Sequence, residues 1–222
     1  MRTLIVSSFV TLDGVIQAPG GPEEDTSGGF EHGGWTVTYW DDVIEGHIGA
    51  SMSVEKEYLF GRGTYEIMAA HWPFAGDDDP FAAMINQTRK YVVSTTLTDP
   101  TWQHTEVISG DAPAAIRALK ASDGPQLEVL GSPGLIQTLL AHDLVDEFGL
   151  MIYPVVVGSG KRLFGDGTVA GGLELADSKI TPSGVIIATY RRAGDLQTGS
   201  FAFEEPTEDE VARRERVVEG AD

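Results

Sequence analysis

The sequence predicts an α/β fold with a mainly parallel central sheet, flanked by helices and completed by an antiparallel strand pair near the C-terminus. Short apolar, β-branched runs alternate along the chain with stretches of helical periodicity, which is the pattern of βαβ units. The last two strand-like runs are joined only by the turn Thr181-Pro182-Ser183-Gly184, which indicates antiparallel pairing. A polar stretch then begins after Ala193, so we expect one domain over residues 1–193 and a tail over 194–222.

Length and composition indicate a globular protein. The chain has 222 residues, of which 41% are hydrophobic and 22% charged, and it contains no cysteine. The absence of cysteine excludes disulfides, thiolate metal sites and a cysteine nucleophile, and it fits a reducing cytosol. Neither a signal-peptide pattern nor an apolar run long enough to span a bilayer is present in the sequence. We therefore expect a soluble, cytoplasmic protein without a membrane partner and without a metal.

The strong negative charge limits the partners. The formal net charge is −19, part of it in the clusters Glu23-Glu24-Asp25, Asp77-Asp78-Asp79 and Glu204-Glu205. Nucleic acids and anionic membranes require Lys and Arg, so neither is an expected partner. Solvated loop charge explains these clusters. A phosphorylated cofactor would have to be held by backbone amides and a few well-placed Arg or hydroxyl groups.

The N-terminal part of the chain predicts a strand, a long loop and a helix. Thr3–Phe9 is apolar and β-branched and leads to the turn signal Leu12-Asp13-Gly14. Residues 19–34 contain six glycines and two prolines, and we expect a long mobile loop there. Asp41–Ala50 is helical, because Val43, Ile44 and Ile48 share a face and Asp41-Asp42 favour a helix N-terminus.

The middle of the chain alternates between strands and helices. Predicted strands are Glu57–Phe60, Lys90–Ser94, Thr105–Ser109 and Gln126–Leu130. Predicted helices are Thr64–Ala70, Pro80–Thr88, Ala112–Ala121 with Ile116 and Leu119 inward, and Leu135–His142.

The C-terminal part begins with an apolar run. Val145–Val157 is long and should be interrupted at Pro154. Leu173–Ile180 and Gly184–Arg191 form the closing strand pair. In the tail, Thr207 and Glu210 make a capping box before a charged helix, Glu208–Glu219.

Four short segments lie at or just beyond the carboxyl ends of predicted strands, where open α/β sheets bind ligands. They are Val6-Ser7-Ser8 leading to Ile16, Gly61-Arg62-Gly63-Thr64, Ser94-Thr95-Thr96, and Gly131-Ser132-Pro133-Gly134. Glycines allow the backbone to approach a phosphate, Arg62 offers a forked donor, and helix starts attract anions. Each segment by itself also fits an ordinary turn or helix cap; their order and spacing together are more specific.

With these residues the chain resembles the dihydrofolate reductase family in its broad sense. Specifically, it resembles the branch related to the C-terminal reductase domain of the bifunctional riboflavin-biosynthesis deaminase/reductase. The resemblance covers about residues 2 to 192 and rests on Ser8 with Leu12-Asp13-Gly14, His32-Gly33-Gly34-Trp35, Phe60-Gly61-Arg62-Gly63-Thr64-Tyr65-Glu66, Val93-Ser94-Thr95 and Gly131-Ser132-Pro133-Gly134-Leu135.

The resemblance implies a dihydrofolate reductase-like fold that binds NADP(H) in extended form, and a homodimer. It places Gly61, Arg62, Gly63 and Thr64 near the pyrophosphate and adenosine ribose, and Ser94 and Thr95 near the 2′-phosphate and adenine. It places Gly131, Ser132, Gly134, Leu135 and Ile136 at the pyrophosphate and nicotinamide turn, and Val6, Ser7 and Ile16 beside the nicotinamide.

The proton donor stays open among Asp42, Asp41 and His32. The two aspartates also suit a helix N-terminus, and His32 also suits a solvated loop. Trp35 and Trp40 flank the first helix and can stack on a flat ring or pack in the core.

The expected activity is hydride transfer from NADPH to a small flat heterocycle or conjugated carbonyl, of the pteridine or pyrimidine class. A non-catalytic nucleotide- or small-molecule-binding protein on the same fold is the alternative, since no active-site acid is unambiguous. A flavin-dependent reductase is a weaker one, because no motif requires FMN.

Overall fold

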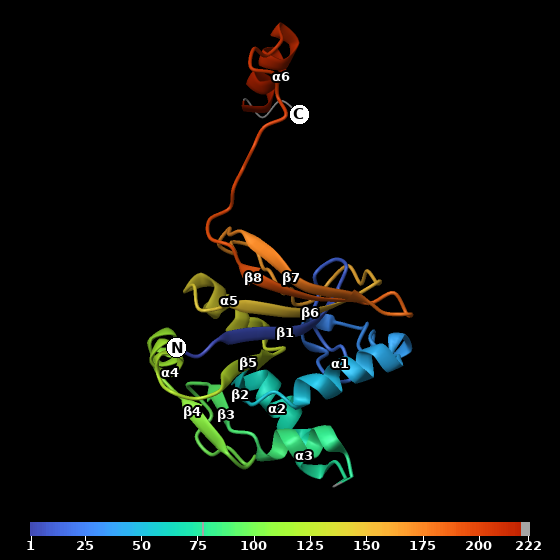
Figure 1. Cartoon of the computed structure of the whole chain (residues 1–222), viewed down its shortest axis with the longest axis vertical. Helices are drawn as coiled ribbons and strands as arrows, with labels where there is room; N and C mark the ends of the chain where they lie inside the picture. The colour runs from blue at the N-terminus through green and yellow to red at the C-terminus, as the bar shows by residue number, and fades with distance from the viewer. Residues whose placement is uncertain (77, 219–222) are drawn as a thin grey trace.

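The computed structural model describes residues 1–76 and 78–218 and shows an eight-stranded sheet with helices on both faces (Figure 1). Asp77 of the acidic cluster and Glu219 at the end of the predicted tail helix lie outside the described residues. The strand order is β4-β3-β2-β5-β1-β6-β8-β7. Every pairing from β4 to β6 is parallel, whereas β8 pairs antiparallel with both β6 and β7. This confirms the predicted fold class.

The strands follow the predicted order closely. They are β1 Leu4–Thr11, β2 Lys56–Gly61, β3 Lys90–Val93, β4 Thr105–Ile108, β5 Gln126–Leu130, β6 Glu147–Tyr153, β7 Leu173–Ile180 and β8 Ile186–Arg192. The predicted run Val145–Val157 shortens to β6, which ends directly before Pro154. Proline cannot donate a ladder hydrogen bond, which explains this end.

Six α-helices and three short 3₁₀ turns occur among the described residues. They are η1 Ser27–Gly29, η2 Val37–Tyr39, α1 Asp42–Met52, α2 Arg62–His71, η3 Trp72–Phe74, α3 Pro80–Gln87, α4 Ala112–Ala121, α5 Pro133–Ala141 and α6 Glu208–Val218. Helix α5 begins at Pro133, two residues before the predicted start, because proline suits the first helical position. No helix in the described ranges has the length and apolarity needed to cross a membrane.

Side-chain alternation along the strands creates two separate cores. On one face Leu4, Val6 and Val129 pack against α4 and α5, through residues such as Ile116 and Ile136. On the other face two further clusters pack under α1 and against α2 and α3. Because successive residues of β1 point to opposite faces, Ser7 and Phe9 face α1 while Val6 and Val10 face α5.

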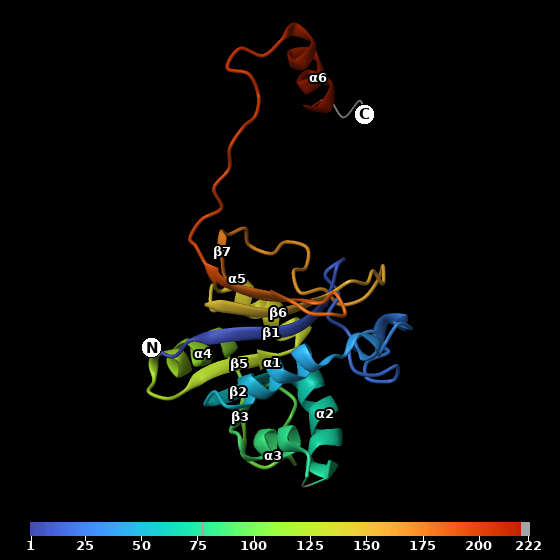
Figure 2. The same cartoon turned by 45° about the vertical axis from the view of Figure 1, so that its right-hand side comes forward.

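The tail stands apart from the domain. After β8 the chain runs away from the sheet and ends in α6, as both views show (Figures 1 and 2). The helix is charged, and its Glu210 pairs with Arg213 and Arg214 at 2.8 and 2.9 Å. None of the residues of α6 is buried. The tail therefore adds nothing to the two cores.

Candidate functional site

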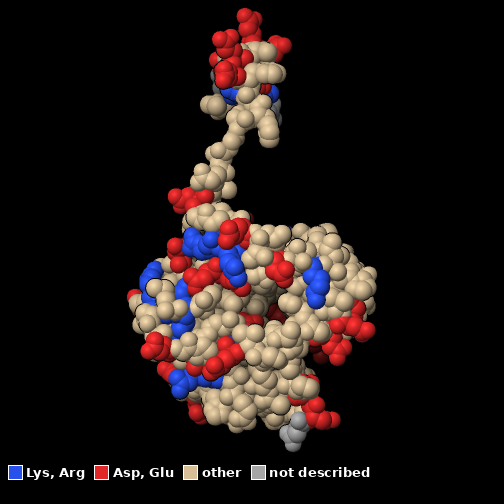
Figure 3. Space-filling model, viewed as in Figure 1, with Lys and Arg blue, Asp and Glu red and all other residues tan. Residues whose placement is uncertain are grey.

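A cavity of about 610 Å³ lies between the sheet and helices α1 and α2. Its floor is the sheet face that carries Ser7 and Phe9 of β1, Glu128 and Leu130 of β5, and Met151 of β6. Figure 3 shows a hollow in this face of the domain, with acidic surface visible inside it. The cavity lies toward the carboxyl ends of neighbouring parallel strands, where α/β sheets bind ligands.

The walls of the cavity are largely apolar and aromatic. Helix α1 contributes His47, Ile48 and Ser51, and helix α2 contributes Thr64, Ile67 and Met68. Aromatic side chains from three further segments complete the wall: Trp40, Trp72 and Phe81. A space of this size and lining suits a flat ring held between apolar surfaces.

Helices α2 and α5 both begin beside the cavity, and both begin without a side-chain cap. Gly61, which precedes α2, has no side chain, and the Ser132 side chain before α5 accepts no hydrogen bond from the first turn of that helix. By contrast, α1, α3 and α4 are capped by Asp41, Asp79 and Asp111. Uncapped first-turn N–H groups remain available to an anion, and the helix dipole favours negative charge there. The two helix starts fit the phosphates of a dinucleotide.

Hydrogen bonds join these two helix starts. The Ser132 amide donates to Thr64 Oγ1 at 3.0 Å, and the Gly61 amide donates to Ser132 Oγ at 3.0 Å. Gly131 and Ser132 both have left-handed backbone, with φ of 55° and 63°. Left-handed backbone is unusual for serine. The turn after β5 is therefore held against the start of α2 in one geometry.

Arg62 connects the start of α2 with the loop after β3. Its Nε donates to Glu66 at 2.6 Å, and its Nη1 donates to Thr96 Oγ1 at 2.5 Å. In that loop Ser94 Oγ accepts from the amides of Thr96 and Leu97. The exposed guanidinium of Arg62 thus lies beside a hydroxyl-rich turn, a combination that can receive a ribose or its phosphate.

Five of the predicted cofactor residues line the cavity: Ser7, Ile16, Thr64, Gly131 and Ser132. Five others are exposed or partly exposed around the two uncapped helix starts and the loop after β3: Gly61, Arg62, Gly63, Thr95 and Gly134. Ser94 is buried as the turn former just described. The side chains of Val6, Leu135 and Ile136 belong to the core on the opposite face. Only the backbone of these three can contribute to a site.

None of the three predicted proton donors is among the described residues that line the cavity. Asp41 caps α1 by accepting from Val43 and Ile44, and it also accepts from the Ser183 amide at 3.0 Å. Desolvation raises its pKa, but these donors and Thr181 outweigh it and hold the pKa well below the usual range. Asp41 is therefore a structural carboxylate, which does not support its prediction as an acid.

Asp42 and His32 are both exposed. Asp42 is the first residue of α1, next to its cap. His32 meets only the ring of Phe30 edge-on, at a centroid distance of 5.9 Å, among the aromatic contacts of the described chain. Neither position supports a role in proton transfer.

The glycine-rich segment 19–34 is pinned to the domain rather than loose. The Gln17 side chain donates to the carbonyls of Asp25 and Ser27 and accepts from the Lys161 amide. Trp35 donates to the Gln17 carbonyl at 2.8 Å and packs edge-on against Tyr153. The expected mobile loop is thus an ordered wall, and Trp35 is a core residue, whereas Trp40 lines the cavity.

Sequence reasoning missed the ionisable groups that do line the cavity. They are Glu24, Asp25, His47, Tyr58, Asp79 and Glu128. Burial raises the pKa of Glu24, although the amides of Gly20 and Gly21 oppose this. Burial lowers the pKa of His47, and Lys179 adds to the effect. These residues stand on loops, a helix and two strands, and no local motif marks them.

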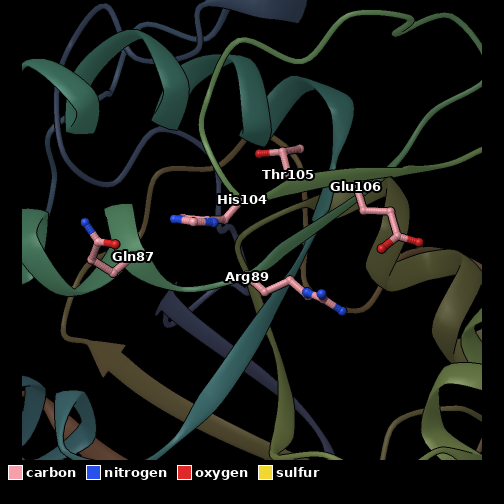
Figure 4. Close-up of a pocket in the computed structure, with 5 residues that line it drawn as sticks. All are labelled: Gln87, Arg89, His104, Thr105 and Glu106. Atoms are coloured by element: carbon pink, nitrogen blue, oxygen red, sulfur yellow. The ribbon is translucent and has the colours of Figure 1, made fainter.

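A second, smaller depression of about 280 Å³ lies at the amino ends of β3 and β4 (Figure 4). It is lined by Gln87, Arg89, His104, Thr105 and Glu106. Figure 4 shows Arg89 and His104 extending in different directions rather than converging. The depression lies at the strand ends opposite to the ligand-binding edge, and its side chains form no common site.

The sequence pattern of the RibD C-terminal domain matches residues 2–187. The chain belongs to the RibD C-terminal domain family. An uncharacterized protein of Bacillus subtilis (strain 168), YyaP, is 27% identical over 196 residues, which is 87% of this chain and 96% of the relative. Membership in the RibD C-terminal domain family confirms the resemblance that the sequence analysis found.

Solved structures of similar fold support the same placement for this RibD C-terminal domain protein. A putative riboflavin biosynthesis protein from Shewanella sp. PV-4 aligns with a TM-score of 0.64 at 21% identity, over 86% of this chain and 99% of that one. Dihydrofolate reductase from Enterococcus faecalis, complexed with NADP(H), aligns with a TM-score of 0.53 at 13% identity, over 86% and 96%. At these identities the likeness establishes the dihydrofolate reductase-like fold.

Proposed function

We propose that this protein is an NADPH-dependent reductase that transfers a hydride to a small flat heterocycle or conjugated carbonyl of the pteridine or pyrimidine class. The observation that carries the proposal is the pair of uncapped helix starts, α2 and α5, tied together beside a largely apolar cavity. Family membership and a fold neighbour complexed with NADP(H) support it.

The residues present fit this cofactor. The first-turn amides of α2 and α5 would hold the pyrophosphate, with Gly63 and Gly134 leaving open space above the backbone. Arg62 and the turn at Ser94–Thr96 would receive the adenosine ribose and its 2′-phosphate. Ser7 and Ile16 would form the wall beside the nicotinamide. When bound, the cofactor supplies the hydride.

The protein's own contribution is to position the substrate, exclude water and exchange a proton. The apolar walls around Ile48, Met68 and Phe81 would hold the substrate ring flat against the sheet. Glu24 and His47 line the cavity, where burial raises the pKa of Glu24 and lowers that of His47, and these two are the groups proposed to exchange the proton.

Titration with NADPH, and separately with NADH, tests the proposal. Trp40 and Trp72 line the cavity, so binding should quench tryptophan fluorescence. We expect NADPH to bind more tightly than NADH, and Arg62→Ala to weaken NADPH binding at least ~10-fold, the scale of one charge-assisted phosphate contact. Arg214→Ala is the matched control, because Arg62 and Arg214 have 49% exposed side chains and both pair with a glutamate one turn away.

Absence of binding of either nucleotide at high micromolar concentration would refute the reductase assignment. The alternative, a non-catalytic binding protein on this fold, is favoured by the position of Asp41, Asp42 and His32 outside the cavity lining. It predicts NADPH binding without turnover on a panel of pteridines, pyrimidines and conjugated carbonyls. Oxidation of NADPH with any of these acceptors contradicts it.

A further inference from the structure

Glu128 places a carboxylate in the floor of the cavity. The side chain lies on β5 between Tyr58 of β2 and Ile5 of β1, its partners in the strand register. Lys56 stands diagonally across on β2, and its Nζ lies 2.5 Å from Glu128 Oε2. Both side chains are nearly buried, with 4% of Lys56 and 8% of Glu128 exposed. Glu128 lines the cavity, whereas Lys56 is not among the described residues that line it.

A buried ion pair of this kind needs a reason beyond stability. Desolvation of both charges offsets most of their attraction, and apolar side chains of similar size commonly serve as well. Most of the surrounding floor is apolar, since Phe9, Leu130 and Met151 line the same space. A charge pair in such a position is better explained by a ligand than by packing.

Other buried cations of the protein have a visible structural task. Arg2 donates to the Pro125 carbonyl as well as to Glu57. Lys120 donates to the Leu144 carbonyl and to Asp146, and Asp146 also accepts from the Leu4 amide. Each of these cations thus binds a main-chain carbonyl just before the amino end of a strand.

The pair Lys56–Glu128 has no such structural task. Within residues 1–76 and 78–218, neither side chain has a hydrogen bond to any backbone group. Glu128 Oε2 is buried and makes no hydrogen bond in the same ranges, so the ion pair with Lys56 is its only polar contact, and Oε1 accepts no hydrogen bond there either. The pair therefore presents an acceptor to the cavity without serving the backbone.

We propose that Glu128 anchors the substrate, accepting at Oε1 an N–H bond from an amino-substituted nitrogen heterocycle. Lys56 is a positioning residue that holds Oε2, so that Oε1 points to the cavity. Ring edges that carry N–H donors fit here, and edges that carry only carbonyl oxygens would face the carboxylate without a proton between them. This inference rests on the proposed function for the identity of the cavity as the substrate site.

Two matched pyrimidines test the inference by calorimetric titration, each with and without saturating NADPH. 2,4-Diaminopyrimidine presents N–H donors, and 2,4-dimethylpyrimidine has the same shape with methyl groups in place of both amino groups, so it has no N–H to donate. We expect the wild type to bind 2,4-diaminopyrimidine at least ~10-fold more tightly than 2,4-dimethylpyrimidine, in line with one charge-assisted hydrogen bond. The double variant Lys56→Met/Glu128→Leu should lose this preference while it keeps its NADPH affinity.

Removing both partners avoids an unpaired buried charge. The matched control is Glu147→Gln/Arg191→Met, which removes the 2.8 Å ion pair between β6 and β8 outside the cavity lining. This control variant should keep the preference for the donor edge.

If the apolar double variant does not fold, Glu128→Gln takes its place. Glu128→Gln should reduce the preference at least ~3-fold, because a charge-assisted hydrogen bond becomes a neutral one. Lys56→Met should weaken binding, and Lys56→Arg should restore it.

The outcomes separate this inference from the proposed function. If NADPH binds but the wild type shows no preference for the donor edge, the inference is wrong and the reductase assignment stands. The same holds if the apolar double variant, or Glu128→Gln in its place, retains the full preference. If NADPH fails to bind while the donor-edge preference depends on Glu128, the anchor is real and the cofactor assignment fails.

Discussion

The backbone amide of Ser132 donates a hydrogen bond to Thr64 Oγ1 at 3.0 Å, across 68 residues of sequence. Through this bond the left-handed turn after β5 meets the start of α2. The Gly61 amide, which donates to Ser132 Oγ at 3.0 Å, makes the second hydrogen bond between the two helix starts. Their mutual position decides whether one extended anion can touch both.

Replacing Thr64 with valine should weaken both stability and NADPH binding. Valine keeps the shape but removes the acceptor of the Ser132 amide, which lies in a residue only 3% exposed. An unsatisfied buried amide costs about 1–3 kcal/mol of unfolding free energy. Thr138→Val is the control, because that hydroxyl bonds the Gly134 carbonyl on the exposed side of α5. Urea denaturation should show that the control loses no more than about 0.5 kcal/mol of unfolding free energy. Equal losses of unfolding free energy in both variants would contradict the role of Thr64.

Gly63→Ala should separate binding from stability. Gly63 lies in α2, and an added Cβ would meet nothing within 4 Å. Alanine should therefore raise the unfolding free energy by up to about 1 kcal/mol through helix propensity. The same methyl group would obstruct a phosphate that approaches the α2 amides, so NADPH affinity should fall.

Gly46→Ala is the matched control for this variant. Gly46 lies inside α1, is exposed, and also has open space at the Cβ position. It should gain similar stability and keep its NADPH affinity, as thermal melts and fluorescence titration can show. Unchanged NADPH affinity in Gly63→Ala would place the pyrophosphate elsewhere.

The buried Lys90 should make stability rise in mildly alkaline solution. Burial lowers its pKa to about 8, although its Nζ donates to the carbonyls of Ile85 and Thr88 and lies 4.5 Å from the ring centroid of Trp102. Between about pH 8 and its unfolded pKa of about 10.4 the unfolded chain binds the proton that the folded chain has lost, so unfolding free energy increases with pH. The gain is at most about 3 kcal/mol.

The pH range in which the effect of Lys90 on unfolding free energy can be measured ends near pH 10. Burial, together with Glu128, raises the pKa of Tyr58, so above about pH 10 the unfolded chain loses a proton that the folded chain retains and stability falls. Urea denaturation between pH 7.5 and 9.5 should show the rise in the wild type. In Lys90→Met the curve should be flatter, and an equal slope in both proteins would show that Lys90 is not the titrating group.

Substitutions of Asp41 should lower the melting temperature without changing NADPH binding, as expected for a carboxylate with a structural role. Asp41→Asn retains an acceptor for the first turn of α1, whereas Asp41→Ala removes it together with the bond from Ser183. We expect the melting temperature to fall more for alanine than for asparagine, with NADPH binding unchanged in both. A loss of turnover in Asp41→Asn at unchanged melting temperature would instead restore Asp41 as a proton donor.

Much of the local structure was predictable because it depends on near neighbours. The strands Gln126–Leu130 and Leu173–Ile180 and the helix Ala112–Ala121 have the predicted bounds, since apolar periodicity and turn residues define them. The glycine turns beside β2 and β5 also lie where the sequence predicts them, although α2 and α5 each begin two residues before the predicted start, at Arg62 and Pro133. The family resemblance depended on these segments, and the family match covers them.

Contacts between distant segments were not predictable from local patterns. Asp41 looked like a candidate acid, but its role as a cap and as partner of Ser183 depends on where the β7–β8 turn lies. The glycine-rich segment 19–34 looked mobile, but Gln17 and Trp35 fasten it through bonds that no periodicity reveals.

By itself the sequence determined the order of strands and helices, the positions of the turns, and the strand ends at which we propose a phosphorylated ligand. The tertiary structure alone decided which side chains share the cavity. Lys56 and Glu128 meet because β2 and β5 are parallel neighbours in one register, with Tyr58 opposite Glu128. Register between strands far apart in the chain is set by the packing of the whole sheet, and a short window of sequence does not contain it.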